Sequence, residues 1–197
     1  MTSAAAGNSG AREAVEDRLE SISNHSWVEK LNPDPETDVN APNRKSRRVK
    51  SGHFVRVQPT PLKRPALIIH SKKVLEDIGL CEGDESSETF VRFFSGDSDA
   101  IPGMKTWATP YALSMMGQKH TSNCPFGTGE GYGDGRAISV GEVLNPKTNQ
   151  RYELQLKGGG QTPFCRGADG RAVLRSSIRE FIASEAMDAL GIPTTRA

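Results

Sequence analysis

Two strand-like runs joined by a short polar turn constrain the fold of this 197-residue chain more than any other feature. The three consecutive segments are AISVGEVL (137–144), NPKTNQ (145–150) and RYELQLK (151–157). In the last run, Tyr152, Leu154 and Leu156 alternate with polar residues, and a period of two places them on one face of a strand. The pattern predicts two strands around a turn, with an apolar core face and Lys157 on the opposite face.

A helical pattern follows the second strand after a loop-like stretch, GGGQTPFCRGADGR (158–171). Within AVLRSSIREFIASEAMDAL (172–190) an apolar stripe recurs at helical spacing. The stripe consists of Leu174, Ile178, Phe181 and Ile182. Gly191 and Pro193 are typical of a helix end. Glu180 lies at the border of the stripe, next to its apolar residues.

Glycine occupies every second position from Gly127 to Gly135 in the stretch FGTGEGYGDGR (126–136), just before the first strand. Glycine weakens a strand interior, so this stretch is not built for sheet stability. Two interpretations remain open on the motif alone. It is either a flexible surface loop or a backbone that approaches an anionic ligand closely through its N–H groups.

The order of these segments matches the amino-terminal lobe of a protein kinase: glycine-rich loop, strand, turn, strand ending in a lysine, loop, and helix with a glutamate. Nucleotide phosphates need a fixed cation, and a flexible lysine needs a carboxylate to hold it. We therefore expect Lys157 and Glu180 to meet. An ordinary surface ion pair, worth about 0–1 kcal/mol, is the alternative. No GxxxxGK[ST] motif occurs, which excludes a Walker-type phosphate loop.

Several of these motifs resemble the selenoprotein O family, over a region from about Trp27 to Ala197. The resemblance is most specific in GYGDGRAISVGEVL and in the stretch from YELQLKGGGQTPFCRGADGR to the chain end, and FFSG adds to it. It implies an α+β fold, a protein-kinase-like N-terminal lobe with an antiparallel sheet, a Gly-rich loop and a helix equivalent to the kinase C helix. It also implies protein adenylylation, in which AMP passes from ATP to Ser, Thr or Tyr hydroxyls.

The resemblance also assigns roles to individual residues. The ATP-binding residues that it implies are Gly133, Gly135, Arg136, Lys157, Asp169 and Gly170. Glu180 is implied to orient Lys157, while a simple turn role within GADGR is the alternative for Asp169. Many members carry GHQFG where this chain has NCPFGTGEGYGDGR, which indicates a divergent subgroup.

The family's catalytic aspartate and its magnesium-binding Asn and Asp are expected beyond Ala197. The resemblance therefore implies no catalytic residue and no metal ligand within this chain, although Mg²⁺ or Mn²⁺ is an implied cofactor beside ATP. We expect a fragment that lacks the C-terminal lobe and is inactive alone. The alternative function is a non-catalytic pseudokinase module that binds a nucleotide or a partner.

Composition divides the chain at about residue 50. We expect a disordered tail and linker over 1–50 and a partial kinase-like domain over 51–197. The first segment is rich in proline and charge, and only 35% of the chain is hydrophobic. Val15, Leu19 and Ile22 could form one short amphipathic turn, but we expect residues 1–24 to be disordered.

Charge and cysteine content bear on partners and location. The 25 basic and 24 acidic residues balance, and we expect ATP and protein substrates as partners, with no nucleic acid and no membrane. A basic cluster at 44–50 is the nucleic-acid alternative, and a solvated linker is its simpler explanation. The three cysteines form no CxxC pair, so no disulfide framework or zinc site is indicated. We expect a soluble intracellular protein; the resemblance leaves a mitochondrial location open, although no clear transit peptide is present.

Overall fold

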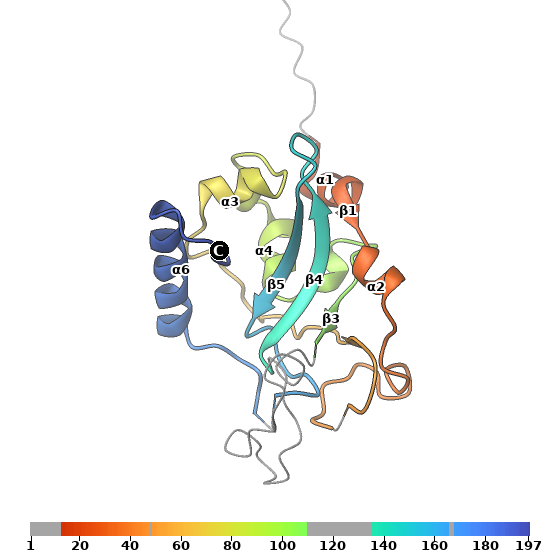
Figure 1. Cartoon of the computed structure of the whole chain (residues 1–197). Coiled ribbons are helices and arrows are strands. Elements are labelled where there is room, and N and C mark those ends of the chain that lie inside the picture. Colours follow the sequence, from red (N-terminus) through yellow and green to blue (C-terminus); the bar gives the residue numbers. More distant parts are fainter. Residues whose placement is uncertain (1–12, 48, 110–134, 166–167) are drawn as a thin grey trace, which may run out of the picture.

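The protein is described by a computed structural model covering residues 13–47, 49–109, 135–165 and 168–197 (Figure 1). Its elements, in chain order, are α1 (Val15–Ile22), β1 (Ser23–Asn24), α2 (Ser26–Lys30), β2 (Val55–Arg56), α3 (Lys72–Asp77), η1 (Asp84–Ser86), α4 (Glu88–Phe94), η2 (Ser98–Ala100), β3 (Trp107–Ala108), β4 (Ala137–Leu144), β5 (Arg151–Lys157) and α6 (Leu174–Ala189). The α+β class and the antiparallel sheet predicted from the sequence are confirmed. None of the helices described is both long and apolar enough to cross a bilayer.

Strand β4 is the centre of the five-stranded sheet (Figure 1). It pairs with β5 along its whole length, with β1 near its end, and with β3 near its start, and each pairing is antiparallel. Strand β2 extends the sheet through β3. The two strands predicted over 137–144 and 151–157 are confirmed at those bounds, and the alternation of exposed and covered residues along β5 follows the predicted period.

The turn between β4 and β5 is fixed by Asn145, which is buried. Its side-chain oxygen accepts hydrogen bonds from the backbone N–H groups of Lys147 at 2.8 Å and Thr148 at 3.1 Å. Its side-chain nitrogen donates to the carbonyls of Glu76 at 3.1 Å and Asp77 at 2.9 Å. One asparagine therefore closes the turn and ties it to the end of α3.

The larger core lies where the sheet meets helices from the first half of the chain. Val140, Val143 and Leu154 supply the sheet side of this core. The helical and loop side consists of Val15, Leu19, Leu75, Ile78, Leu80, Phe90, Phe93 and Ile101. A second cluster, formed by Val55, Val57, Ala108, Ile138 and Phe164, lies near the start of β4. These two clusters hold the β4–β5 hairpin rigidly, and the sequence-predicted site lies at its open end.

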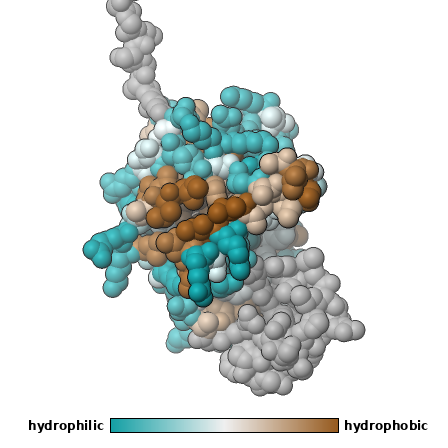
Figure 2. Space-filling model, turned by 90° about the vertical axis from the view of Figure 1, so that its left-hand side faces the viewer, coloured by the Kyte–Doolittle hydropathy of each residue, from teal (hydrophilic) through white to brown (hydrophobic). Residues whose placement is uncertain are grey.

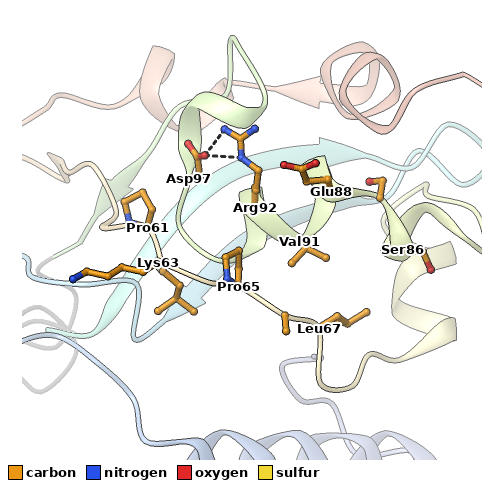
Figure 3. Close-up of a pocket in the computed structure, with 12 residues that line it drawn as sticks. Pro61, Lys63, Pro65, Leu67, Ser86, Glu88, Val91, Arg92 and Asp97 are labelled. Atoms are coloured by element: carbon orange, nitrogen blue, oxygen red, sulfur yellow. Dashed lines mark hydrogen bonds and ion pairs between the residues drawn. The ribbon is translucent and has the colours of Figure 1, made fainter.

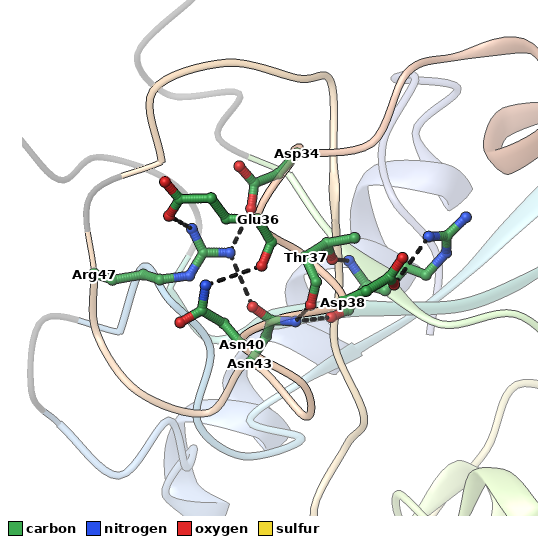
Figure 4. A network of polar contacts seen from close by, with 8 residues as sticks. Asp34, Glu36, Thr37, Asp38, Asn40, Asn43 and Arg47 are labelled. Atoms are coloured by element: carbon green, nitrogen blue, oxygen red, sulfur yellow. Dashed lines mark hydrogen bonds and ion pairs between the residues drawn. The ribbon is translucent and has the colours of Figure 1, made fainter.

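Residues 13–47 correct the expectation of a tail and linker. Val15 and Leu19 of α1 are buried in the larger core, and β1 pairs with β4. Most of the polar stretch that follows is folded around Arg47 (Figure 4). Its guanidinium pairs with buried Asp34 and donates to the side chain of Asn43 at 2.9 Å. Composition predicted a linker because it shows how many charged residues the segment has. It does not show that Arg47 and Asp34 pair within the fold.

Residues 1–12 lie outside the described part of the chain. The expected disorder there stays a prediction.

The helix predicted after the loop at 158–171 is confirmed as α6, but most of its apolar stripe is not buried against the core. Leu174, Ile178 and Ile182 are 58%, 38% and 59% exposed. Figure 2 shows hydrophobic side chains gathered on the side of the molecule where α6 lies. The face of α6 turned to the rest of the fold carries Ser184, the buried residue among the described helix positions.

We expect Leu19→Ala to destabilise the fold by about 2–5 kcal/mol, because it removes a fully buried side chain from the larger core. Val39→Ala is the matched control, since Val39 is 88% exposed in the same amino-terminal region. Denaturant unfolding of both variants measures the difference. Equal, near-zero effects would show that α1 is not part of the core.

Candidate functional site

The two predicted ATP-binding cations, Arg136 and Lys157, lie at neighbouring strand ends. Ala137, the first residue of β4, is paired with Lys157, the last residue of β5. One residue beyond this pair, the Gly158 N–H donates a 2.7 Å hydrogen bond to the Arg136 carbonyl. Both cationic side chains are exposed. The open end of the hairpin therefore presents two positive charges to solvent.

Lys157 meets Glu180 of α6, as the sequence predicted. The lysine Nζ lies 3.3 Å from the glutamate Oε2, and the side chains are 43% and 48% exposed. An ion pair this accessible contributes at most about 1 kcal/mol, because water competes for both charges. The contact is confirmed, and its small energy means that it contributes little to the stability of the fold.

Of the glycine run, the structure describes Gly135, and it also describes Arg136, the residue that follows. A Cβ at Gly135 would lie 2.3 Å from the Phe164 carbonyl oxygen, so no side chain fits there. The hydroxyl of Thr162, a fully buried residue, donates to the Gly135 carbonyl at 3.2 Å and accepts from the Phe164 N–H at 3.1 Å. Close packing of two loops explains this glycine. The other predicted glycine, Gly133, lies outside the described residues.

Sequence reasoning missed Thr162. Its role depends on the backbone that it meets 27 residues earlier in the chain. No local pattern within GGGQTP marks such a contact.

The loop between β5 and α6 folds back on itself at Gly170. This glycine has a φ of +68°, and a Cβ there would lie 1.9 Å from the Gly160 carbonyl oxygen. Its neighbour Asp169 is exposed and accepts a 2.9 Å hydrogen bond from the Arg171 N–H. The turn role considered for Asp169 is therefore present in the structure. Its exposed position leaves the carboxylate accessible from solvent.

The basic cluster at 44–50 is partly used by the fold. Arg44 donates to the carbonyl of Gln58 at 3.2 Å and to that of Pro59 at 2.8 Å. Arg47 is occupied by Asp34. Two of the cations that would serve a nucleic-acid patch are thus turned to internal acceptors.

The predicted site does not coincide with the cavity that the structure describes. Within the described ranges, no group of three or more His, Cys, Asp or Glu residues could hold a metal ion. A cavity of about 580 Å³ lies where the segment Pro61–Leu67 passes α4 (Figure 3). Arg92 and Asp97 form a 2.7 Å ion pair at its wall. Of the predicted ATP-binding residues that the structure describes, none lines this cavity.

Comparisons with known proteins agree with the family resemblance. Residues 41–197 match the family model described as Protein adenylyltransferase SelO. The chain is 47% identical over 172 residues to the Protein nucleotidyltransferase YdiU of Azoarcus sp. (strain BH72), covering 87% of this chain and 30% of that protein. It is 51% identical over 141 residues to the protein of the same name from Xanthomonas campestris pv. campestris (strain 8004), covering 72% and 25%. The chain thus spans less than a third of the length of these relatives.

Gly170, in the loop before α6, and Gly191, after α6, separate two reasons for glycine: backbone conformation and lack of space. The test compares Gly170→Ala with Gly191→Ala. Both glycines have positive φ, but nothing lies within 4 Å of a Cβ at Gly191. We expect Gly191→Ala to cost roughly 1–2 kcal/mol for the left-handed backbone. Gly170→Ala should cost about 1–3 kcal/mol more, because the loop must move away from Gly160. Thermal or denaturant unfolding measures both, and equal costs would contradict the close approach.

Proposed function

The chain belongs to the protein adenylyltransferase SelO family, and from that premise we propose that it forms the ATP-binding part of a protein adenylyltransferase. In the proposed reaction, AMP passes from ATP to a Ser, Thr or Tyr hydroxyl of a protein substrate. The observation that carries the proposal is the Lys157–Glu180 contact at the open end of the β4–β5 hairpin. Since the chain spans under a third of its relatives, the transfer activity is proposed for the longer protein.

A kinase-like amino-terminal lobe is the architecture that we propose for this part. Support comes from the antiparallel pair β4–β5, from a lysine at the end of β5, and from a glutamate on the next helix that reaches it. In kinases the same arrangement holds a lysine on nucleotide phosphates.

The residues at the open end fit a polyphosphate in charge and in access. ATP is a polyanion. Arg136 and Lys157 are both exposed cations, and Lys157 pairs with Ala137, the residue after Arg136. The guanidinium of Arg136 offers a planar fork to phosphate oxygens, whereas the Lys157 ammonium acts as a compact charge. Glu180 limits the positions of that ammonium, so less entropy is lost when phosphate binds.

AMP transfer forms a bond between the attacking hydroxyl oxygen and the α-phosphorus, and the hydroxyl proton passes to a base. It breaks the bond from the α-phosphorus to the oxygen that joins it to the β-phosphorus, and this oxygen leaves with pyrophosphate. Negative charge grows on the leaving pyrophosphate during this step. Cations placed beside the phosphates stabilise that charge more in the transition state than in bound ATP. We assign this role to Lys157 and Arg136, whereas Asp169 and Gly170 are proposed as further nucleotide contacts.

Phosphoryl chemistry of this kind uses a divalent cation, Mg²⁺ or Mn²⁺, to neutralise phosphate charge. The described residues supply no ligand group for it. We propose that its ligands and the base for the attacking hydroxyl belong to the part of the longer family proteins that this chain does not span.

A non-catalytic module that binds a nucleotide or a protein partner is the second candidate. The exposed apolar residues of α6 favour it, because such a surface suits a protein contact. Transfer of AMP by the longer protein separates the two candidates, since a binding module holds ATP without consuming it.

Lys157→Ala should weaken ATP binding about tenfold or more, the effect expected when one hydrogen bond to a charged group is lost. Lys147→Ala is the control, since Lys147 lies in the exposed turn at the other end of the hairpin. Calorimetric titration of the purified chain with ATP gives both dissociation constants. Equal affinities in the two variants would remove Lys157 from the site.

We expect the 197-residue chain to bind ATP without transferring AMP, because we propose that the metal ligands and the base belong to the part of the longer relatives that it does not span. ATP labelled at the α-phosphate, with Mg²⁺ or Mn²⁺ and a generic protein acceptor, measures transfer. The Azoarcus relative serves as the positive control. Label on protein that disappears in Lys157→Ala would show that this chain is sufficient for the reaction.

A further inference from the structure

Helix α6 lacks the apolar packing that usually fixes a helix on a sheet. Leu174, Ile178, Ile182 and Met187 are exposed, and among the described positions of α6 only Ser184 is buried. A helix with an unburied apolar stripe gains little stability from its contact with the rest of the fold. Phe181 is the partly buried member of the stripe, so the position of α6, and with it that of Glu180, depends largely on polar contacts.

A cluster of charges provides such contacts at the carboxy-terminal end of α6. Arg196, in the segment after the helix, bridges two carboxylates one turn apart. Its Nη1 lies 2.8 Å from Asp188 Oδ2, and its Nη2 lies 2.9 Å and 3.0 Å from the two carboxylate oxygens of Glu185. Arg196 is 17% exposed, so this cluster is better shielded than the Lys157–Glu180 pair. Forked arginine–carboxylate pairs are among the strong polar contacts of proteins.

The same carboxylates join α6 to the start of α3. The Ser71 hydroxyl, at the N-cap of α3, donates to Glu185 at 2.8 Å. The Lys73 ammonium lies 3.1 Å from Asp188. The cluster therefore connects the end of α6, the terminal segment and α3, which is itself packed on the core through Leu75.

Strand β5 is close to this cluster at its first end. Tyr152 of β5 packs against the larger core, and burial raises the pKa of its phenol. The nearby charge of Asp77 raises this pKa further, whereas the charges of Lys73 and Arg196 lower it. Lys73 and Arg196 of the cluster therefore act electrostatically on the first end of β5, whereas the Lys157–Glu180 pair lies at its last residue.

We propose that Arg196, through Glu185 and Asp188, is a positioning residue that sets α6 against α3 so that Glu180 reaches Lys157. Removing Arg196 leaves two carboxylates at i and i+3 on one helix with less compensating charge, and such pairs repel. Helix α6 would then spend more time displaced from β5. An effect on ATP affinity follows as well, and that part rests on the proposed function of Lys157.

Amine labelling tests the positioning without any nucleotide. The acylation rate of Lys157 is compared by mass spectrometry with that of Lys147, which is exposed in the hairpin turn. Arg196→Ala and Glu185→Gln should raise the Lys157 rate roughly twofold to fivefold, as loss of an exposed ion pair would. Glu180→Gln should do the same, and Arg196→Lys should restore part of the protection. The control is Arg179→Ala, an exposed position of α6 with no ion pair to a described residue, which should change nothing.

An unchanged Lys157 rate in both Arg196→Ala and Glu185→Gln would overturn the proposal. Circular dichroism checks that each variant is folded.

ATP affinity supplies the second measurement. If Arg196 acts through Glu180, then Arg196→Ala should weaken ATP binding in the parent chain but cause no further loss in a Glu180→Gln background. A full additional loss in that background would show that Arg196 acts by another route. A parent chain that binds no ATP would count against the proposed function alone, because the labelling rates judge the positioning independently.

Discussion

The pairing of β4 with three other strands is the constraint on which the rest of the structure depends. β4 is buried almost throughout, so each of its polar groups needs a partner. Glu142 shows how this is met: its carboxylate accepts from the Trp27 N–H at 2.8 Å and from the Ser26 hydroxyl at 3.1 Å, while Arg151 lies 3.3 Å away. A buried carboxylate in the sheet thereby fixes α2, an element more than a hundred residues earlier.

The open end of the hairpin combines closely packed backbone with exposed charge. Gly135 and Gly170 sit where backbones approach too closely for any side chain, so the loops around the predicted site are held by packing. Lys157 and Arg136, in contrast, extend into solvent from this fixed base. Rigid backbone beside exposed cations suits a polyanionic ligand, because the charges need little reorganisation of the fold to meet it.

Helix α6 shows that polar contacts can set a helix position. Its apolar stripe is exposed, and its alignment with the sheet depends on Glu180, Glu185 and Asp188. Such contacts are directional but individually weak in water. The lysine–glutamate pair is thus only as well placed as the more shielded cluster at the other end of the helix allows.

The sequence alone predicted the β4–β5 hairpin and α6 from local periodicity, and the order of motifs in a kinase lobe predicted that Lys157 meets Glu180. Only the tertiary structure decided the place of residues 13–47, because Leu19 and β1 contact elements that are distant in sequence. It also decided which face of α6 meets the fold. A hydrophobic stripe is buried only where another surface covers it, and the sequence of α6 does not show such a surface. Arg196 and Ser71 come from other segments, and their contacts with Glu185 turn a polar face of α6 inward.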